Sequence, residues 1–321
     1  MNELLSYEFF NNLLRLLITG GLGFIGSHLV DSLSSSKSHK IMIITKTLSK
    51  KNNIKKLSNN IKIEKTNLTN FKKIGQIIEK FKPDIIVHLA GNTSHSKSFE
   101  KPLDDLEVNA KTTLFMLEKI RTIGLDCKFI LGSTFIVIGK PDHLPVNENT
   151  SCNPTTIYGA NRLASEHFCK IYHDVYGIDT RIFRITNSYG PREQIIPNKN
   201  AVNFIIHSAL KNNQISIFNK GNFFRDLIYV TDVISAINLI IKKGKPGNLY
   251  WISSGKKTWF YDLAKLLQNK TGCKINYPKT PKYTTKVDVG NFVVNNSKLK
   301  SLGWKQKISL ENGIKKTLNS F

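Results

Sequence analysis

Short apolar runs alternate with longer amphipathic stretches over the first 185 residues of the chain. The runs have the length and continuous hydrophobicity of buried strands, and they are Leu14–Thr19, Lys40–Thr45, Ile61–Lys65, Asp84–Leu89, Cys127–Ser133 and Thr180–Ile185. Between most of them, apolar residues recur at helical spacing in Phe24–Ser35, Phe71–Phe81, Leu103–Ile123 and Ile157–Tyr176. Strands that alternate with helices of this length predict a parallel, doubly wound α/β sheet covered by helices on both faces.

A glycine-rich turn joins the first predicted strand to the first predicted helix. In "LLITGGLGFIGSHLVDSL" the glycines are Gly20, Gly23 and Gly26. Glycines at these points permit a tight turn, the close approach of a pyrophosphate and contact between helix and strand. The amino terminus of the helix that begins near Phe24 then faces the phosphates. The sequence therefore predicts a Rossmann-type dinucleotide site rather than a merely structural turn.

The pattern changes after Thr186, where loops and scattered helices such as Val202–Lys211 and Asp232–Lys242 replace the regular alternation. We expect an N-terminal extension over residues 1–12, a dinucleotide-binding domain over 13–185 and a smaller C-terminal α/β substrate-binding domain over 186–321, whose elements can interleave.

The composition of the chain restricts the class of protein and its partners. A hydrophobic content of 40% and no apolar run near the length of a bilayer span predict a soluble protein without a membrane partner. Glu3, Glu8 and Arg15 argue against a signal peptide. The four cysteines form no CxxC pair and no metal spacing with the eight histidines, so we expect reduced thiols, no metal and a cytoplasmic location.

The formal net charge of +24 raises the question of nucleic-acid binding. The lysines are spread along the whole chain, without a basic tail or a module that interleaves basic and aromatic residues. A solvated cationic surface is therefore favoured over a nucleic-acid partner. Such a surface also attracts an anionic small substrate.

Tyr158 precedes Arg162 by four residues in "IYGANRLASEHF", which puts both side chains on one helix face. A nearby cation can lower the pKa of a phenol, and a phenol that ionises near neutral pH can act as an acid or base. The alternative from this stretch alone is an ordinary amphipathic helix with a surface arginine.

Several motifs in order resemble those of the extended short-chain dehydrogenase/reductases of the nucleotide-sugar epimerase and dehydratase group, which includes UDP-glucose 4-epimerase. They are "TGGLGFIG" from Thr19, "HLAG" from His88, "DLEVNA" from Asp105, "GSTFIVIG" from Gly132, "YGANR" from Tyr158, "RITNSYGPRE" from Arg184, "RDLIYVTDV" from Arg225 and "LGWKQKISLENGI" from Leu302. The resemblance covers nearly the whole chain.

The resemblance implies roles for individual residues. Tyr158 is the expected acid/base and Thr134 the partner of the same sugar oxygen, with Arg162 completing the catalytic set. Ser94, Thr134, Asn187 and Arg225 are expected to contact the nucleotide sugar, and an arginine suits a diphosphate. The remaining residues expected at the cofactor, besides Tyr158 and Arg162, are Gly20, Gly23, Phe24, Ile25, Gly26, Thr45, Lys46, Asn67, Leu68, Leu89, Ala90, Gly91, Asn109 and Ile185.

Two of these positions depart from the family pattern. The usual acid at the end of the second strand is replaced by Thr45 and Lys46, which removes the usual argument for NAD and leaves room for a 2′-phosphate near Lys46. NAD is expected from the resemblance, with NADP as the alternative. The usual lysine four residues after the tyrosine is Arg162, which keeps the charge but not the bonding geometry of an ammonium. The substitution leaves open a catalytically weakened protein.

The residues after Thr134 bear on the reaction. Dehydratases of the group carry an Asp-Glu pair there, whereas this chain has Phe135 and Ile136, which cannot move a proton. Epimerisation and net reduction of a 4-keto sugar remain, and the "NSYGPRE" and "LGW" regions resemble those of 4-epimerases. The resemblance therefore favours an epimerase that forms a transient 4-keto sugar with bound NAD. The alternatives are an NAD(P)H-dependent reductase of 4-keto-6-deoxy sugars and a nucleotide-sugar-binding protein of reduced activity.

The resemblance also implies a homodimer. Relatives pair two helices per subunit into a four-helix bundle, and the corresponding segments here are Leu103–Ile123 and Ile157–Tyr176. These helices carry more apolar residues than are needed to cover one face of the sheet, which suits a second contact with a partner subunit. The apolar residues are Leu114, Leu117, Leu163 and Phe168.

Overall fold

The structure is a computed structural model that describes residues 13–35, 39–55, 57–195, 201–279 and 286–321. The predicted N-terminal extension, residues 1–12, lies outside these ranges. Among the described residues, no helix is both long enough and apolar enough to cross a bilayer.

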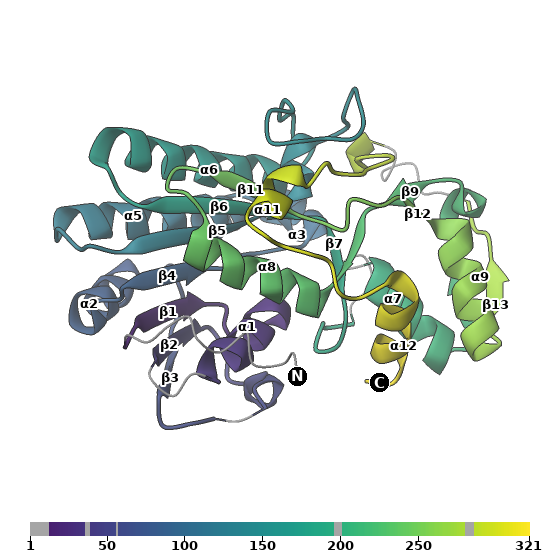
Figure 1. Cartoon of the computed structure of the whole chain (residues 1–321), viewed down its shortest axis with the longest axis horizontal. Helices are drawn as coiled ribbons and strands as arrows, with labels where there is room; N and C mark the ends of the chain where they lie inside the picture. The colour runs from purple at the N-terminus through teal and green to yellow at the C-terminus, as the bar shows by residue number, and fades with distance from the viewer. Residues whose placement is uncertain (1–12, 36–38, 56, 196–200, 280–285) are drawn as a thin grey trace.

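Seven parallel strands form the central sheet in the order β11–β6–β5–β4–β1–β2–β3 (Figure 1). They are β1 (Arg15–Thr19), β2 (Lys40–Thr45), β3 (Ile61–Lys65), β4 (Ile85–His88), β5 (Lys128–Thr134), β6 (Thr180–Ile185) and β11 (Leu249–Ile252). The six predicted strands are confirmed to within one residue at each end. The winding of the chain reverses between β1 and β4, and doubly wound proteins bind their ligands at such a switch point, outside the carboxyl ends of the strands.

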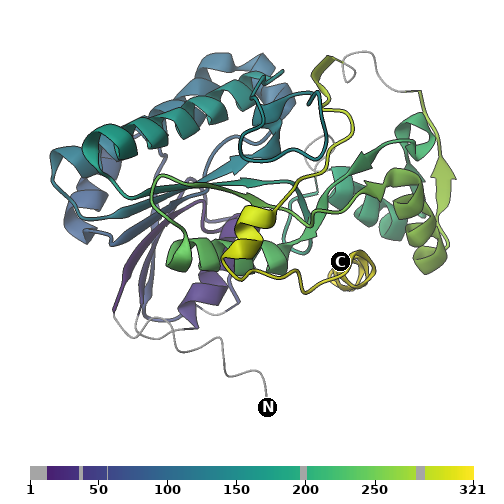
Figure 2. The same ribbon diagram turned by 45° about the horizontal axis from the view of Figure 1, so that its top comes forward.

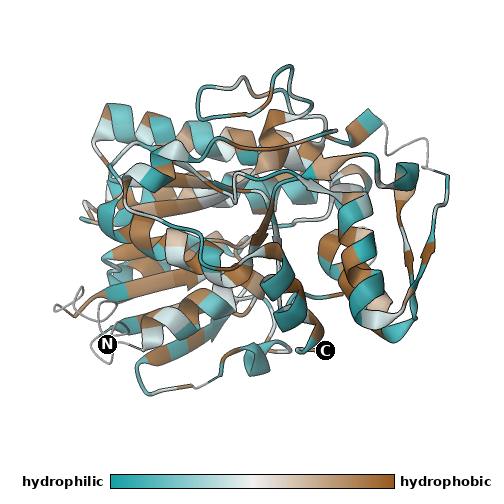
Figure 3. Cartoon of the chain, turned by 45° about the vertical axis from the view of Figure 1, so that its right-hand side comes forward, coloured by the Kyte–Doolittle hydropathy of each residue, from teal (hydrophilic) through white to brown (hydrophobic). Residues whose placement is uncertain are grey.

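Helices cover both faces of the sheet, as predicted (Figure 2). On one face α1 (Phe24–Ser34) packs against α8 (Val230–Lys243), and on the other lie α2 (Phe71–Phe81), α5 (Thr112–Thr122) and α6 (Ile157–Tyr176). Figure 3 shows the strands as predominantly hydrophobic and the helices as divided between hydrophobic and hydrophilic faces. This is the pattern of a parallel sheet that is buried on both sides.

The helix predicted over Leu103–Ile123 is not regular along its length. It consists of α4 (Pro102–Leu106), a π-helical turn η3 (Glu107–Lys111) and α5. Within the turn, the carbonyl oxygen of Asn109 accepts a hydrogen bond from Ser165 Oγ of α6 at 2.6 Å. The wider turn accommodates this contact and directs the buried Asn109 side chain into the protein.

The chain after Thr186 forms short elements beside the carboxyl edge of the sheet (Figure 1). They include β7 (Asn187–Tyr189), α7 (Ala201–Lys211), β8 (Gln214–Ser216), β9 (Phe224–Arg225), β10 (Leu227–Tyr229), β12 (Thr258–Trp259), α9 (Phe260–Thr271), β13 (Lys274–Asn276) and α12 (Leu310–Leu318). The short helix α11 (Ser297–Ser301) instead packs against β11. Strand β11 and helix α8 also follow Thr186 in the sequence, but they belong to the central sheet and its cover.

Short helices complete the first part of the chain. They are η2 (Lys51–Asn53), α3 (His95–Glu100) and η4 (Phe135–Ile138), the last directly after β5. A further short helix, η5 (Phe218–Gly221), precedes β9.

Candidate active site

The glycine turn joins β1 to the amino terminus of α1 at the switch point of the sheet. A Cβ atom on Gly26 would collide with the carbonyl oxygen of Gly20, and one on Gly20 would lie 3.1 Å from the Cα of Ala90. The helix begins at Phe24, after Gly23, and no side chain caps it. The first-turn N–H groups, those of Phe24 and Ile25 among them, therefore have no capping side chain and suit an anionic group such as a phosphate.

The next strands along the edge supply the residues predicted at the adenosine end. Thr45 ends β2, and its hydroxyl donates to the carbonyl oxygen of Thr47 at 2.9 Å. Lys46 is exposed and follows directly. Asn67 and Leu68 follow β3 at the same edge, with Asn67 exposed and Leu68 buried. The departure at Thr45 and Lys46 thus puts a cation where the family carries an acid.

The end of β4 is fixed to the end of β1 by a buried polar contact. Thr19 Oγ1 lies 2.8 Å from His88 Nδ1 and accepts a hydrogen bond from the Ala90 N–H at 3.1 Å. Leu89, Ala90 and Gly91 leave the sheet from this point, beside the glycine turn. The contact joins the ends of the two strands at the switch point.

Tyr158 lies in the first turn of α6 and is only 8% exposed. Its hydroxyl shares a hydrogen bond with the side chain of Thr134, at the end of β5. Burial raises the pKa of Tyr158 above its ordinary value of 10, while the charge of Arg162 and the bond to Thr134 lower it. Burial has the larger effect, so the pKa of Tyr158 is raised overall even though Arg162 lowers it.

Arg162 is 4% exposed, and the alternative of a surface arginine is therefore wrong. Within the described part of the chain it has no hydrogen bond or ion pair. A Cβ atom on Gly91 would lie 3.5 Å from Arg162 Nη1 and would collide with Asn109 Oδ1, which is itself buried without a partner. A buried cation and a buried acceptor beside a glycine fit a polar ligand such as a dinucleotide ribose.

The residues predicted to bind the substrate diphosphate, Asn187 and Arg225, lie in the segments that follow β6. Asn187 begins β7, and its side-chain Nδ2 is buried without a partner. Strand β7 pairs with β10, which directly follows the segment that carries Arg225. Arg225 is 8% exposed and donates to Asp288 Oδ1 at 2.6 Å. These neighbours combine an amide donor with a nearly buried guanidinium, a set that suits a diphosphate.

Two predicted residues have mainly local contacts. Ser94 caps α3, since its Oγ accepts from the Lys97 N–H at 3.4 Å. Ile185 ends β6, next to Ile252 of β11. Neither is joined by a hydrogen bond to the group formed by Tyr158, Thr134 and Arg162.

Sequence reasoning missed three partners of the site, of which Asp105 and Phe292 are buried and Asp288 is exposed. Asp105 accepts from the side chains of Asn161 and Asn109, and Asp288 pairs with Arg225. Phe292 packs against Phe135 with the two rings tilted by 60° and their centroids 5.1 Å apart. The local sequence around Asp105 and Asp288 looks like that of ordinary surface acids. Only their contacts in the folded protein show that they belong to the site.

A glycine turn on the first strand of a doubly wound sheet, with a buried tyrosine and cation at the carboxyl edge, defines a Rossmann-type α/β protein. The model of the GDP-mannose 4,6 dehydratase family matches residues 17–317. The chain belongs to this family, in the extended short-chain dehydrogenase/reductase superfamily of nucleotide-sugar epimerases and dehydratases.

Individual relatives include both reaction types. A putative UDP-glucose 4-epimerase of Methanocaldococcus jannaschii is 33% identical over 95% of this chain and 97% of its own length. A dTDP-D-glucose 4,6-dehydratase of Dictyostelium discoideum is 31% identical over 94% of this chain and 80% of its own. The crystal structure of Thermus thermophilus UDP-glucose 4-epimerase in complex with NAD has a TM-score of 0.85, with 25% identity and coverage of 95% and 98%. An enzyme of this superfamily is thereby supported, whereas the relatives do not separate epimerase from dehydratase.

Proposed function

We propose that the protein is a nucleotide-sugar 4-epimerase that uses bound NAD. The observation that carries this proposal is the group at the carboxyl edge. Tyr158 shares a hydrogen bond with Thr134 beside the buried Arg162, while the two residues after Thr134 are Phe135 and Ile136. The site thus has one acid/base, Tyr158, that can act on a sugar hydroxyl. It lacks the Asp-Glu pair with which dehydratases remove water, because Phe135 and Ile136 stand at those positions.

The proposed cofactor site combines the features described above. The amino terminus of α1, beginning at Phe24, would hold the pyrophosphate, and the residues that end β2 and β3 would meet the adenosine end. Arg162 and Asn109 Oδ1 would bind the nicotinamide ribose, since both are buried and lack partners among the described residues. NAD is favoured by the Thermus relative, and NADP stays an alternative because Lys46 can meet a 2′-phosphate.

The chain's own residues would act on the sugar as follows. Tyr158 takes the proton of the 4-hydroxyl group, and Thr134 orients the same oxygen. NAD, when bound, supplies reversible acceptance of the hydride from C4. Arg162 favours the ionised phenol through its charge, and burial opposes ionisation. Tyr158 returns the proton when the 4-keto sugar is reduced on its opposite face.

Arg225 and Asn187 would bind the nucleotide diphosphate. The guanidinium is held by Asp288 and by the carbonyl oxygen of Phe224, which accepts from Nη1 at 3.1 Å. Phe135 and Phe292 form an apolar wall near the reacting end of the same site, because both pack in the cluster that contains Tyr158.

An experiment can distinguish an epimerase from the two alternatives, a reductase and a binding protein. A reductase would require NAD(P)H to exchange in each cycle, and a binding protein would hold the ligand without turnover. We would denature the purified protein and quantify released nucleotide by absorbance and mass spectrometry. We would then incubate the protein with UDP-, GDP-, CDP- and dTDP-hexoses.

Tightly bound NAD together with interconversion of 4-epimers supports the proposal. Formation of a 4-keto-6-deoxy sugar, with loss of water, would identify a dehydratase and overturn it. Consumption of added NADPH by a 4-keto substrate would identify the reductase.

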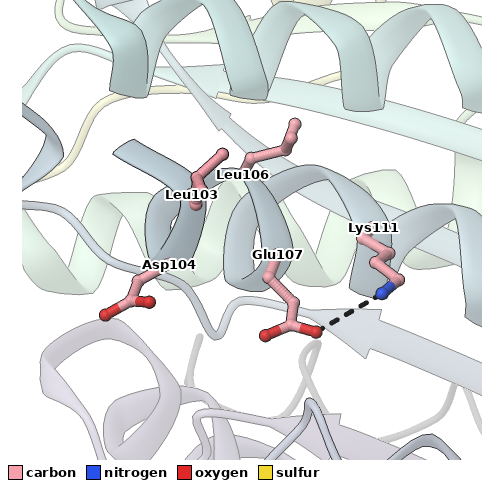
Figure 4. Close-up of a pocket in the computed structure, with 5 residues that line it drawn as sticks. All are labelled: Leu103, Asp104, Leu106, Glu107 and Lys111. Carbon is pink, nitrogen blue, oxygen red and sulfur yellow. Dashed lines mark hydrogen bonds and ion pairs between the residues drawn. The ribbon is translucent and has the colours of Figure 1, made fainter. Parts of the chain in front are cut away.

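We further propose a homodimer built on the helices that cover one sheet face. Leu103 is 77% exposed and lies with Leu106 at a hollow that Asp104, Glu107 and Lys111 also line. Figure 4 shows the two leucines projecting to one side of the helix and the two acids to the other. Leu114 is exposed as well, but Leu117 lies in the core and is not available to a partner. The four free cysteines also fit the proposed cytoplasmic location.

A further inference from the structure

Asp105 is a buried carboxylate on which three asparagine side chains converge. It is 1% exposed and lies in α4. Its Oδ1 accepts from Asn92 Nδ2 at 2.7 Å and from Asn109 Nδ2 at 3.0 Å, and its Oδ2 accepts from Asn161 Nδ2 at 2.8 Å. The donors come from the loop after β4, from η3 and from α6. One carboxylate thus joins three of the segments that form the candidate active site.

These bonds determine which way the Asn109 amide faces. Its Nδ2 also donates to the carbonyl oxygen of Asn92 at 3.1 Å, so both amide hydrogens are used on the Asp105 side. The other end of the amide, Oδ1, is left facing Gly91 and Arg162 without a partner. An amide group has one donor end and one acceptor end, so a carboxylate on one side fixes the acceptor on the other.

The same bonds leave Arg162 without an acidic partner in the described part of the chain. Asn161, the residue before Arg162 in α6, uses Asp105 Oδ2, and the two other amides use Oδ1. The next carboxylate on α6, Glu166, pairs with Arg184 at 2.6 Å. The guanidinium charge is therefore free to act on Tyr158 and on a bound ligand.

The charged and hydrogen-bonding groups around Tyr158 come from three elements. Arg162 of α6 and Thr134 of β5 lower its pKa, and the charge of Asp105 in α4 raises it. His88 of β4 faces Arg162, and its own pKa is lowered by burial and by that cation, so it is neutral. Removing the charge of Asp105 should then lower the pKa of Tyr158.

We propose that Asp105 is a positioning residue of the active site, which holds Asn109 Oδ1 toward the cofactor ribose and keeps Arg162 unpaired beside Tyr158. This inference rests on the proposed function, because it assumes that Arg162 and Asn109 meet NAD. It assigns to Asp105 a role beyond stability. A carboxylate that only stabilised the fold would not change the affinity for NAD or the pH dependence of turnover.

The test compares Asp105→Asn with a matched variant elsewhere, Asp232→Asn. Asp232 is also 1% exposed, and its carboxylate accepts hydrogen bonds from the N–H groups of Lys307 and Ile308 at 3.0 and 2.9 Å. It lies in α8, which covers the face of the sheet opposite to α6. Both variants should lower the melting temperature, since each leaves buried donors facing an amide. We would remove bound nucleotide, measure the Kd for NAD by calorimetry and record the pH–rate profile.

We expect Asp105→Asn to raise the Kd for NAD at least about tenfold and to move the ionisation of Tyr158 to lower pH, while Asp232→Asn changes neither. If Asp105→Asn does not fold, Asn161→Ala, which removes a single donor, should weaken NAD binding in the same direction. Equal Kd values and equal pH profiles for wild type and the folded variant would overturn the inference.

The two proposals fail differently. A wild-type protein that binds NAD but epimerises no nucleotide sugar would refute the proposed function, and the NAD arm would still decide the role of Asp105. A wild-type protein without measurable affinity for NAD would overturn both.

Discussion

Arg225 Nη2 donates a 2.6 Å hydrogen bond to Asp288 Oδ1, although the two residues are 63 positions apart. The carboxylate side chain is 51% exposed and stays solvated without its partner, whereas the guanidinium is nearly buried. The pair is therefore worth little to stability and instead orients the arginine that we assign to the diphosphate.

For this reason Arg225→Met should raise the KM for a nucleotide sugar at least about tenfold, through loss of charge-assisted bonds to phosphate, and should lower the melting temperature little. Steady-state kinetics test this. The control is Arg121→Met, which removes the surface pair with Glu118 on α5 and should leave KM unchanged. An Arg225→Met enzyme with wild-type KM would remove Arg225 from the substrate site.

Tyr158→Phe should keep the fold and reduce turnover at least about 100-fold, because it removes the proposed acid/base while preserving the ring. Tyr172→Phe is a close control. Tyr172 lies on the same helix, is also 8% exposed and hydrogen-bonds to Glu118 at 2.7 Å, away from Thr134. Near-normal turnover in the Tyr158 variant, or an equal loss in both, would contradict the assignment.

Arg162→Met should move the acid limb of the pH–rate profile to higher pH. The charge of Arg162 lowers the pKa of Tyr158, so its removal leaves burial to raise that pKa further. Arg162→Lys keeps the charge and should retain activity. Profiles measured from pH 6 to 10 test both variants, and an unchanged profile in Arg162→Met would exclude the electrostatic role.

His88 should make the protein sensitive to acid. Burial, and secondarily the charge of Arg162, lowers its pKa from 6.5 to about 3. A lowered pKa means that the folded state prefers the neutral ring, so its contribution to stability is complete above pH 6.5 and is lost as the pH falls toward 3.

His88→Gln does not titrate in this window. Between pH 6 and 4 the wild type should therefore lose up to about 1.4 kcal/mol per pH unit more than the variant. Urea unfolding at several pH values measures the difference. Parallel curves for the two proteins would show that His88 is not the responsible group.

Gly26→Ala should lower stability by about 1–3 kcal/mol and weaken NAD binding, because the added methyl group meets the carbonyl oxygen of Gly20. Gly75→Ala in α2 is the control. There a Cβ atom would lie 3.4 Å from the end of the Lys119 side chain and 3.5 Å from the ring of Phe115, which are ordinary contacts, so the variant should be neutral or more stable by up to about 1 kcal/mol. Thermal unfolding with and without NAD compares the two, and equal stability changes would refute the steric argument.

Local patterns were sufficient for much of this molecule. The six strands predicted before Thr186 are six of the seven strands of the sheet, because continuous apolar runs of that length are stable only when buried. The helix around Tyr158 and Arg162 was also predictable, since its spacing puts both residues on one face.

Other features depend on contacts that are distant in sequence. Asp105 and Asn161 are 56 positions apart, and nothing local to either residue indicates their hydrogen bond. The π-helical turn at Asn109 likewise depends on Ser165 of another helix. The seventh strand, Leu249–Ile252, is only four residues long, and its place in the sheet is decided by pairing with β6.

That late strand has a consequence for synthesis on the ribosome. Until Ile252 has left the exit tunnel, β6 is an unpaired edge whose N–H and C=O groups are open to other chains. A fragment that ends at residue 185 would keep this edge permanently, and truncation there should yield an aggregating product rather than an autonomous half. The nascent protein closes its sheet only after the whole chain through Ile252 has been made and has left the tunnel.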